Sequence, residues 1–159
     1  MEAFKSYDIR GVYGEDFTLE DVYRIGYFLP QLLNAKRVLV GRDMRLSSPD
    51  MFASLSKGIT DAGADVCDMG LCTTPMVYYF TAKHGFDASV MITASHNPKE
   101  HNGLKISRHD ALPVGFDTGL GELQKMVKEK PLVPTTEKGK IISEAFADGG
   151  AVQCGFCIP

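Results

Sequence analysis

The sequence predicts an α/β protein, a three-layer α/β/α sandwich with a mixed, mostly parallel sheet. Short apolar runs at 36–41, 64–70 and 87–95 have the length and β-branched content of buried strands. Amphipathic segments of helical length separate these runs. Connections of that length favour parallel pairing of the strands, with helices on both faces of the sheet.

A first helix is expected over residues 18–34. Apolar side chains recur there at helical spacing, and Thr18 with Asp21 forms a start signal. Pro30 is expected to disturb the end of this helix, because proline has no N–H to donate and its ring crowds the preceding turn.

The first strand, 36–41, is followed by a second helix. Ser48 is its expected N-cap and Pro49 its first residue, and the helix should run to about residue 63. The second strand follows at 64–70.

Thr74-Pro75 should open a third helix that runs to about residue 84, ahead of the third strand at 87–95. Residues 104–107 are a candidate fourth strand, with antiparallel pairing as one option. Residues 116–130 are a weak helix because glycines reduce its stability. From residue 131 the pattern fades, which predicts a domain over 1–130 and an extension over 131–159.

Composition excludes several functional classes. The net charge of -3 lacks the basic excess that favours nucleic acid or an anionic membrane surface. No apolar run approaches the roughly 18 to 20 residues that a membrane span needs, and residues 1–10 lack the apolar core of a signal peptide. We expect a cytoplasmic protein with reduced cysteines and a small solute as its ligand.

Residues 93–98 and 102–105 form the densest chemical cluster, at the end of the third predicted strand. They combine a hydroxyl, an imidazole, an amide and a lysine within a few residues. Ligands of open α/β sheets bind beyond the carboxyl ends of the strands, which is where this loop is expected. An ordinary polar turn is the alternative, both here and for the polar clusters at 6–11 and 41–48.

The absence of two kinds of motif argues against hydrolase and nucleotide-binding chemistry. The G-x-S-x-G elbow of serine hydrolases is absent, as are the Walker-type and G-x-G-x-x-G phosphate loops. A serine that carries a phosphoryl group instead needs cations around the phosphate. The available cations are Lys105, Arg10, Arg42 and Arg45.

Four segments resemble the first domain of the α-D-phosphohexomutases, the phosphoglucomutase and phosphomannomutase family. They are FKSYDIRG at 4–11, VGRDMRLSS at 40–48, Thr74-Pro75 and, above all, TASHNPKEHNGLKI at 93–106. The resemblance covers about residues 4–130, and T-A-S-H-N-P with a following N-G-x-K is a specific motif.

The resemblance implies that Ser95 is the phosphoserine of an enzyme that interconverts hexose 1-phosphate and hexose 6-phosphate. Phosphorylated Ser95 would also be a ligand of Mg²⁺, and a hexose 1,6-bisphosphate would activate the enzyme. Arg10 would contact the serine phosphate, and Lys105 with His96 would assist proton transfer. The implied substrate contacts are Tyr7, Arg42 and Asn97, although Arg42 or Arg45 could instead brace the loop through Asp43.

The later motifs of the family are missing: D-G-D-x-D-R for Mg²⁺, G-E-x-S-G for the sugar and R-x-S-G-T for the phosphate. We therefore expect the chain alone to be weakly active or inactive. The alternative is a non-catalytic phosphate-binding or interaction domain. Surfaces left by the missing domains are expected to favour self-association.

The end of the chain has a different resemblance. Residues 144–159 are similar to the [2Fe-2S] segment G-A-V-Q-C-G-F-C-x-P of molybdenum hydroxylase small subunits. Such a cluster needs four thiolates, and Cys154 and Cys157 supply two. Cys67 and Cys72 belong to the second predicted strand and its loop, which makes them poor substitutes. An incidental tail is the favoured interpretation, ahead of zinc or iron–sulfur binding.

Overall fold

The structure is a computed structural model that describes residues 2–133 and 135–143. In this part of the chain six strands form one sheet in the order β1-β5-β4-β2-β3-β6. Strands β2, β3, β4 and β6 pair in parallel, and β5 is antiparallel to both β4 and β1. The strands are β1 (Ile9–Val12), β2 (Arg37–Arg42), β3 (Asp65–Leu71), β4 (Ala88–Ile92), β5 (His101–Arg108) and β6 (Ile141–Ile142). The predicted mixed, mostly parallel sheet is confirmed.

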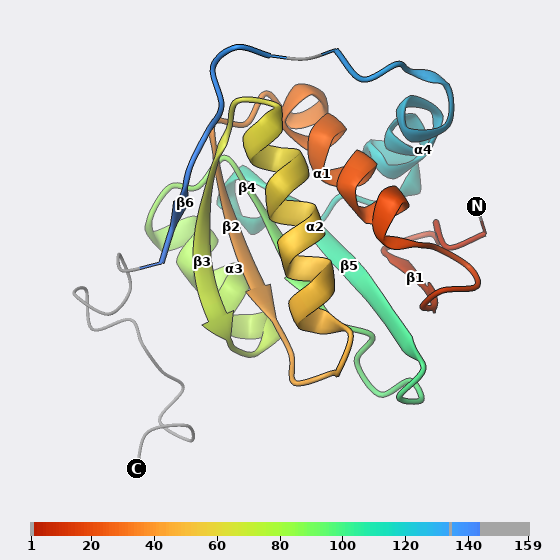
Figure 1. Cartoon of the computed structure of the whole chain (residues 1–159). Helices are drawn as coiled ribbons and strands as arrows, with labels where there is room; N and C mark the ends of the chain where they lie inside the picture. Colours follow the sequence, from red (N-terminus) through yellow and green to blue (C-terminus); the bar gives the residue numbers. More distant parts are fainter. Residues whose placement is uncertain (1, 134, 144–159) are drawn as a thin grey trace.

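Helices cover both faces of this sheet, as predicted (Figure 1). They are α1 (Leu19–Leu33), α2 (Ser48–Asp61), α3 (Thr74–Lys83) and α4 (Leu120–Glu129). The larger core packs α1, α2 and α4 against one face, and a smaller core around Val77 and Met91 packs α3 against the other. No helix in the described part of the chain has the length and apolarity that a bilayer span requires.

The start of α1 is the predicted one. Thr18 is the N-cap, its hydroxyl accepts from the amide of Asp21, and the Asp21 carboxylate accepts from the amide of Thr18. The expected disturbance at Pro30 is wrong, because the helix continues through Pro30 to Leu33. The left-handed Asn34 then ends it and donates its N–H to the carbonyl of Pro30. Pro30 removes one hydrogen bond of the helix, the one to the carbonyl of Gly26, and the packing of α1 in the core outweighs that loss.

The predicted cap of α2 is one residue off. Ser47 is the N-cap, and Ser48 is the first helical residue. The buried hydroxyl of Ser48 donates to Oδ1 of Asp43 at 2.8 Å instead of capping the helix. Tertiary contact with the loop after β2 therefore decides what this serine does.

The ends of β4 and β5 differ from the predicted bounds, because hydrogen bonds to segments distant in sequence set them. β4 ends at Ile92, because residues 94–97 form a turn, and β5 is twice as long as the predicted 104–107. The two outer strands, β1 and β6, were not predicted. Both are short edge strands with weak alternation of apolar residues, which leaves little local signal.

The segment 116–130 divides into a 3₁₀ turn at Phe116–Thr118 and the helix α4. Gly119 separates them with φ of 157°, a backbone conformation that L side chains rarely adopt. The chain after α4 returns to the sheet: the amide of Gly139 donates to the carbonyl of Thr60, and β6 then pairs with β3.

Candidate active site

Ser95 lies exposed in a turn just beyond the end of β4. Its amide donates to Oγ1 of Thr93 at 3.0 Å, and the amide of Asn97 closes the turn on the carbonyl of Ala94 at 3.1 Å. Ser95 has φ of 55°, the left-handed region that costs a residue with a side chain roughly 1 kcal/mol or more. Such strain persists when surrounding contacts hold it and is frequent at functional sites.

Arg10 and Lys105 share one carboxylate beside this turn. Arg10 on β1 pairs with Gly103 on β5, and Lys105 follows two residues later, on the same face of the strand. Oδ2 of Asp8 is 3.4 Å from Nη2 of Arg10 and 3.7 Å from Nζ of Lys105. Nη1 of Arg10 also donates to Oδ1 of Asn97 at 3.4 Å. The structure thus brings together Arg10, Lys105 and Asn97, three of the predicted site residues.

Asp8 is the residue of this cluster that the sequence analysis did not single out. Its side chain is only 7% exposed, so it holds both cations from below the surface. Burial raises the pKa of Tyr78 on α3, and the negative charge of Asp8 adds to that shift. The available signal was the spacing of Asp8 and Arg10, because alternate residues of an extended segment share a face, although Asp8 itself lies in the bend before β1.

The arginine that ends β2 and the one in the loop after it have separate contacts. Nη1 of Arg42 is 2.8 Å from Oδ1 of Asp68, and its guanidinium lies 4.6 Å from the centre of the Phe52 ring. Arg45, in contrast, reaches the Ser95 loop, and its Nε lies 3.3 Å from Oδ2 of Asp43. Of the two arginines, Arg45 is the one that braces the loop together with Asp43. Arg42 is held by β3, and its substrate contact stays a prediction.

Asn102 and Gly103 of the motif stabilise the packing around the site. Asn102 is fully buried, and its Nδ2 donates to the hydroxyls of Ser47 and Ser48 at 2.8 and 3.1 Å. A Cβ on Gly103 would lie 2.2 Å from the carbonyl oxygen of Ile9. Glycine at this position therefore allows β1 to approach β5 closely enough to carry Arg10 to the site.

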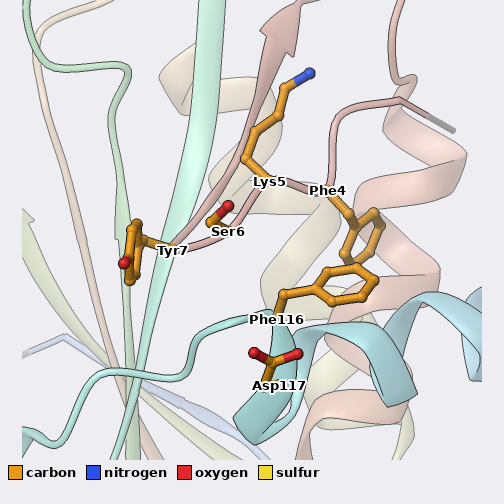
Figure 2. Close-up of a pocket in the computed structure, with 6 residues that line it drawn as sticks. All are labelled: Phe4, Lys5, Ser6, Tyr7, Phe116 and Asp117. Carbon is orange, nitrogen blue, oxygen red and sulfur yellow. The ribbon is translucent and has the colours of Figure 1, made fainter.

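Tyr7 is 82% exposed on the segment that leads into β1. Together with Phe4, Lys5, Ser6, Phe116 and Asp117 it lines a hollow of about 580 Å³. In Figure 2 the side chain of Tyr7 points away from those of Phe4 and Phe116. His96 is also exposed, next to Ser95 in the turn. Substrate contact by Tyr7 and proton transfer by His96 stay predictions.

Among the described residues, no three His, Cys, Asp or Glu side chains lie close enough together to hold a metal ion. A metal at the Ser95 turn would therefore draw mainly on the phosphate that Ser95 is predicted to carry. Cys67 and Cys72 are free thiols, as expected. Cys154, Cys157 and the [2Fe-2S] resemblance lie outside the described residues.

Comparisons with known proteins converge on one family. Residues 1–131 match the model of the phosphoglucomutase/phosphomannomutase alpha/beta/alpha domain I. A phosphomannomutase of Klebsiella pneumoniae is 40% identical over 134 residues, covering 84% of this chain and 85% of that protein. A phosphomannomutase of Escherichia coli (strain K12) is 39% identical over 154 residues, covering 93% of this chain but 34% of that protein.

A solved structure gives the same result. The crystal structure of a phosphoglucomutase/phosphomannomutase family protein from Burkholderia thailandensis matches with a TM-score of 0.81 at 29% identity. The match covers 93% of this chain and 34% of that chain, so this chain spans about a third of the length of the Burkholderia and E. coli proteins. The residues around Ser95, Asp8 and Arg45 all lie within the matched 1–131. This chain therefore belongs to the phosphoglucomutase/phosphomannomutase family and carries its alpha/beta/alpha domain I.

Proposed function

We propose that this chain is the phosphoserine-bearing domain of a phosphohexomutase, in which Ser95 exchanges a phosphoryl group with a hexose phosphate. The observation that supports this most strongly is the position of Ser95, exposed in a left-handed turn at the end of β4. Arg10 and Lys105 lie beside that turn, joined to it through Asn97 and to each other through Asp8. Cations next to an exposed hydroxyl favour a dianionic phosphate there.

In the loading step, the bond between phosphorus and a sugar oxygen of a hexose 1,6-bisphosphate breaks, and a bond from phosphorus to Oγ of Ser95 forms. The proton of the Ser95 hydroxyl is transferred to the released sugar oxygen. We assign that proton transfer to Lys105 and His96, and the holding of the phosphate to Arg10. In the reverse step, phosphorylated Ser95 transfers its phosphoryl group to O6 of hexose 1-phosphate, and the 1,6-bisphosphate forms. Transfer of the 1-phosphoryl group of that bisphosphate to Ser95 then releases hexose 6-phosphate.

The family typically uses Mg²⁺. When bound at the phosphoserine, the ion would add charge stabilisation at the transferring group. The described residues place no cluster of three ligands for it, so a phosphate oxygen on Ser95 is the one ligand we assign to them. The remaining ligands would come from outside these residues.

Turnover by the chain alone is expected to be low or absent. The chain spans about a third of the E. coli relative, and binding energy from the rest of a site orients the reacting atoms. Steady-state conversion of glucose 1-phosphate or mannose 1-phosphate by the purified chain tests this expectation. Turnover comparable to that of a full-length relative would refute it.

The central test is phosphate transfer to Ser95. The purified chain is incubated with Mg²⁺ and glucose 1,6-bisphosphate, and phosphate is located by peptide mass spectrometry. Phosphate on Ser95 that is lost in Ser95→Ala and retained in Ser6→Ala, which changes another exposed serine, supports the proposal. If wild type takes no phosphate on Ser95 but binds the bisphosphate in calorimetry, the chain is a phosphate-binding domain and the proposal fails.

A further inference from the structure

The guanidinium of Arg45 is bound to four main-chain carbonyls of the Ser95 loop. Nη2 donates to the carbonyl oxygens of Ser95 and Asn97 at 2.9 and 2.8 Å. Nη1 donates to those of Pro98 and His101 at 2.7 and 3.0 Å. The side chain is only 12% exposed, so it lies within the loop and not over it. One side chain therefore holds both the turn that contains Ser95 and the turn that leads into β5.

Asp43 also holds the Ser95 loop, and we call Arg45 and Asp43 together the clamp. Its carboxylate accepts from the amide of Arg45 and from the hydroxyl of Ser48, at 3.1 and 2.8 Å. The hydroxyl of Thr93 donates to Oδ2 of Asp43 at 2.7 Å and accepts from the amide of Ser95 at 3.0 Å. A continuous chain of hydrogen bonds therefore runs from the helix α2, through Asp43, to the backbone of Ser95.

This arrangement explains how Ser95 keeps its left-handed backbone. The conformation is unfavourable for a residue with a side chain, so an unsupported loop would relax from it. The carbonyls of Ser95 and Asn97 both point to one nitrogen of Arg45, which the relaxed loop would not allow. Hydrogen bonds from a charged donor are stronger than neutral ones, so four of them outweigh the strain of a single residue.

We propose that Arg45 is the positioning residue of the acceptor serine. It holds the loop so that Oγ of Ser95 is presented for phosphoryl transfer by this domain alone, without the rest of a full-length enzyme. The inference rests on the proposed function only in that Ser95 is the acceptor. Arg45 acts through the loop backbone and not by touching the phosphate, since Nη1 and Nη2 donate to the four carbonyls and the buried Nε faces Oδ2 of Asp43.

Lysine cannot replace arginine in this role. The planar guanidinium offers five N–H donors in a fixed fork, whereas an ammonium offers three from a single atom. Arg45→Lys therefore keeps the positive charge but not the bonds to four carbonyls. Arg37→Lys is the matched control, because Arg37 lies at the opposite end of β2, where its guanidinium is 4.7 Å from the centre of the Phe86 ring.

Trypsin provides a readout that does not depend on activity. Lys99 is exposed in the middle of the clamped loop, and cleavage after it requires the loop to open locally. Cleavage after Lys57, within α2, reports opening of the whole domain in the same digest. We expect Arg45→Lys and Arg45→Ala to increase the rate at Lys99 by about 10-fold or more over the change at Lys57.

The second readout is the initial rate of Ser95 phosphorylation by glucose 1,6-bisphosphate. We expect a loss of about 10-fold to 100-fold in both Arg45 variants, the range by which misplacement of a reacting group slows transfer. The bisphosphate concentration that gives half the maximal rate should change little, because Arg45 does not hold the ligand. Arg37→Lys should leave both the Lys99 cleavage and the maximal rate close to those of wild type.

The outcomes separate this inference from the proposed function. Unchanged cleavage at Lys99 in both Arg45 variants overturns the clamp, and faster cleavage with undiminished phosphorylation overturns the positioning role. A loss confined to Arg45→Ala, with full activity in Arg45→Lys, also overturns it, because charge alone would then suffice. If wild type is never phosphorylated on Ser95, the proposed function and the positioning role fail together, while cleavage at Lys99 still decides whether Arg45 holds the loop.

Discussion

Gly26 and Gly58 lie against each other where α1 crosses α2. A Cβ on Gly26 would be 2.3 Å from the carbonyl oxygen of Leu55, and a Cβ on Gly58 would be 2.1 Å from that of Tyr23. Real Cβ atoms essentially never come so close to backbone atoms, so the two helices touch through their main chains. This contact holds α2, and with it Ser48, against the body of the domain.

Gly58→Ala is expected to destabilise the domain by about 1 to 3 kcal/mol, the usual range for overpacking. Helix propensity alone predicts the opposite sign, a gain of roughly 1 kcal/mol for alanine over glycine. Urea unfolding of both proteins measures the difference. Ala53→Gly, at an exposed position of the same helix, gives the propensity effect by itself, and a Gly58→Ala protein as stable as wild type contradicts the close contact.

Asp61 makes stability depend on acid pH. A hydrogen bond from Lys57, with further ones from Tyr23 and Lys138, lowers the pKa of Asp61 from 3.8 to about 2. A carboxyl whose pKa is lower in the folded state stabilises that state above its unfolded pKa. This contribution is therefore complete above about pH 4 and is lost as the pH falls towards 2.

Thermal unfolding of wild type and Asp61→Asn between pH 7 and pH 2 tests this dependence. The variant should melt at a lower temperature than wild type at pH 7, and the gap should close as the pH falls from about 4 to 2. Asp117→Asn, at an exposed position in the 3₁₀ turn, is the control. A gap that stays constant down to pH 2 would show that Asp61 acts without its charge.

Cys72 is expected to be nearly inert in the folded protein. Burial raises the pKa of its thiol from 9.0 to about 11, so little thiolate is present at pH 8. Burial also raises the pKa of Cys67. The thiolate is the reactive form, so native thiols should react with Ellman's reagent about 100-fold more slowly than the same thiols in urea.

The reaction is measured in a Cys154→Ser/Cys157→Ser protein, where only Cys67 and Cys72 remain to react. Equal rates in buffer and in urea would mean that neither thiol is protected by the fold. The same variant, compared with wild type for iron and zinc content, tests the favoured interpretation of residues 144–159 as an incidental tail. Metal bound by wild type and absent from the variant would overturn that interpretation.

Local sequence determined the parts of the fold whose stabilising contacts are close along the chain. The Thr18–Asp21 capping box involves residues three apart, and the β2, β3 and β4 runs are apolar enough to be recognised without their partners. β1 and β6 have no such signal, because pairing with β5 and β3 is what makes them strands. Ser95 was found from its motif, which is continuous in sequence.

Tertiary structure decided how the residues around Ser95 divide their tasks. Arg42 and Arg45 are three residues apart and equally basic, yet one ends β2 beside Asp68 and the other enters the Ser95 loop. The role of Asp8 as the shared partner of Arg10 and Lys105 depends on the pairing of β1 with β5, which brings the two cations together. Sequence alone pointed to the proposed acceptor serine and to its available cations. Their pairing depends on distances between segments as many as 97 residues apart, which only the folded sheet sets.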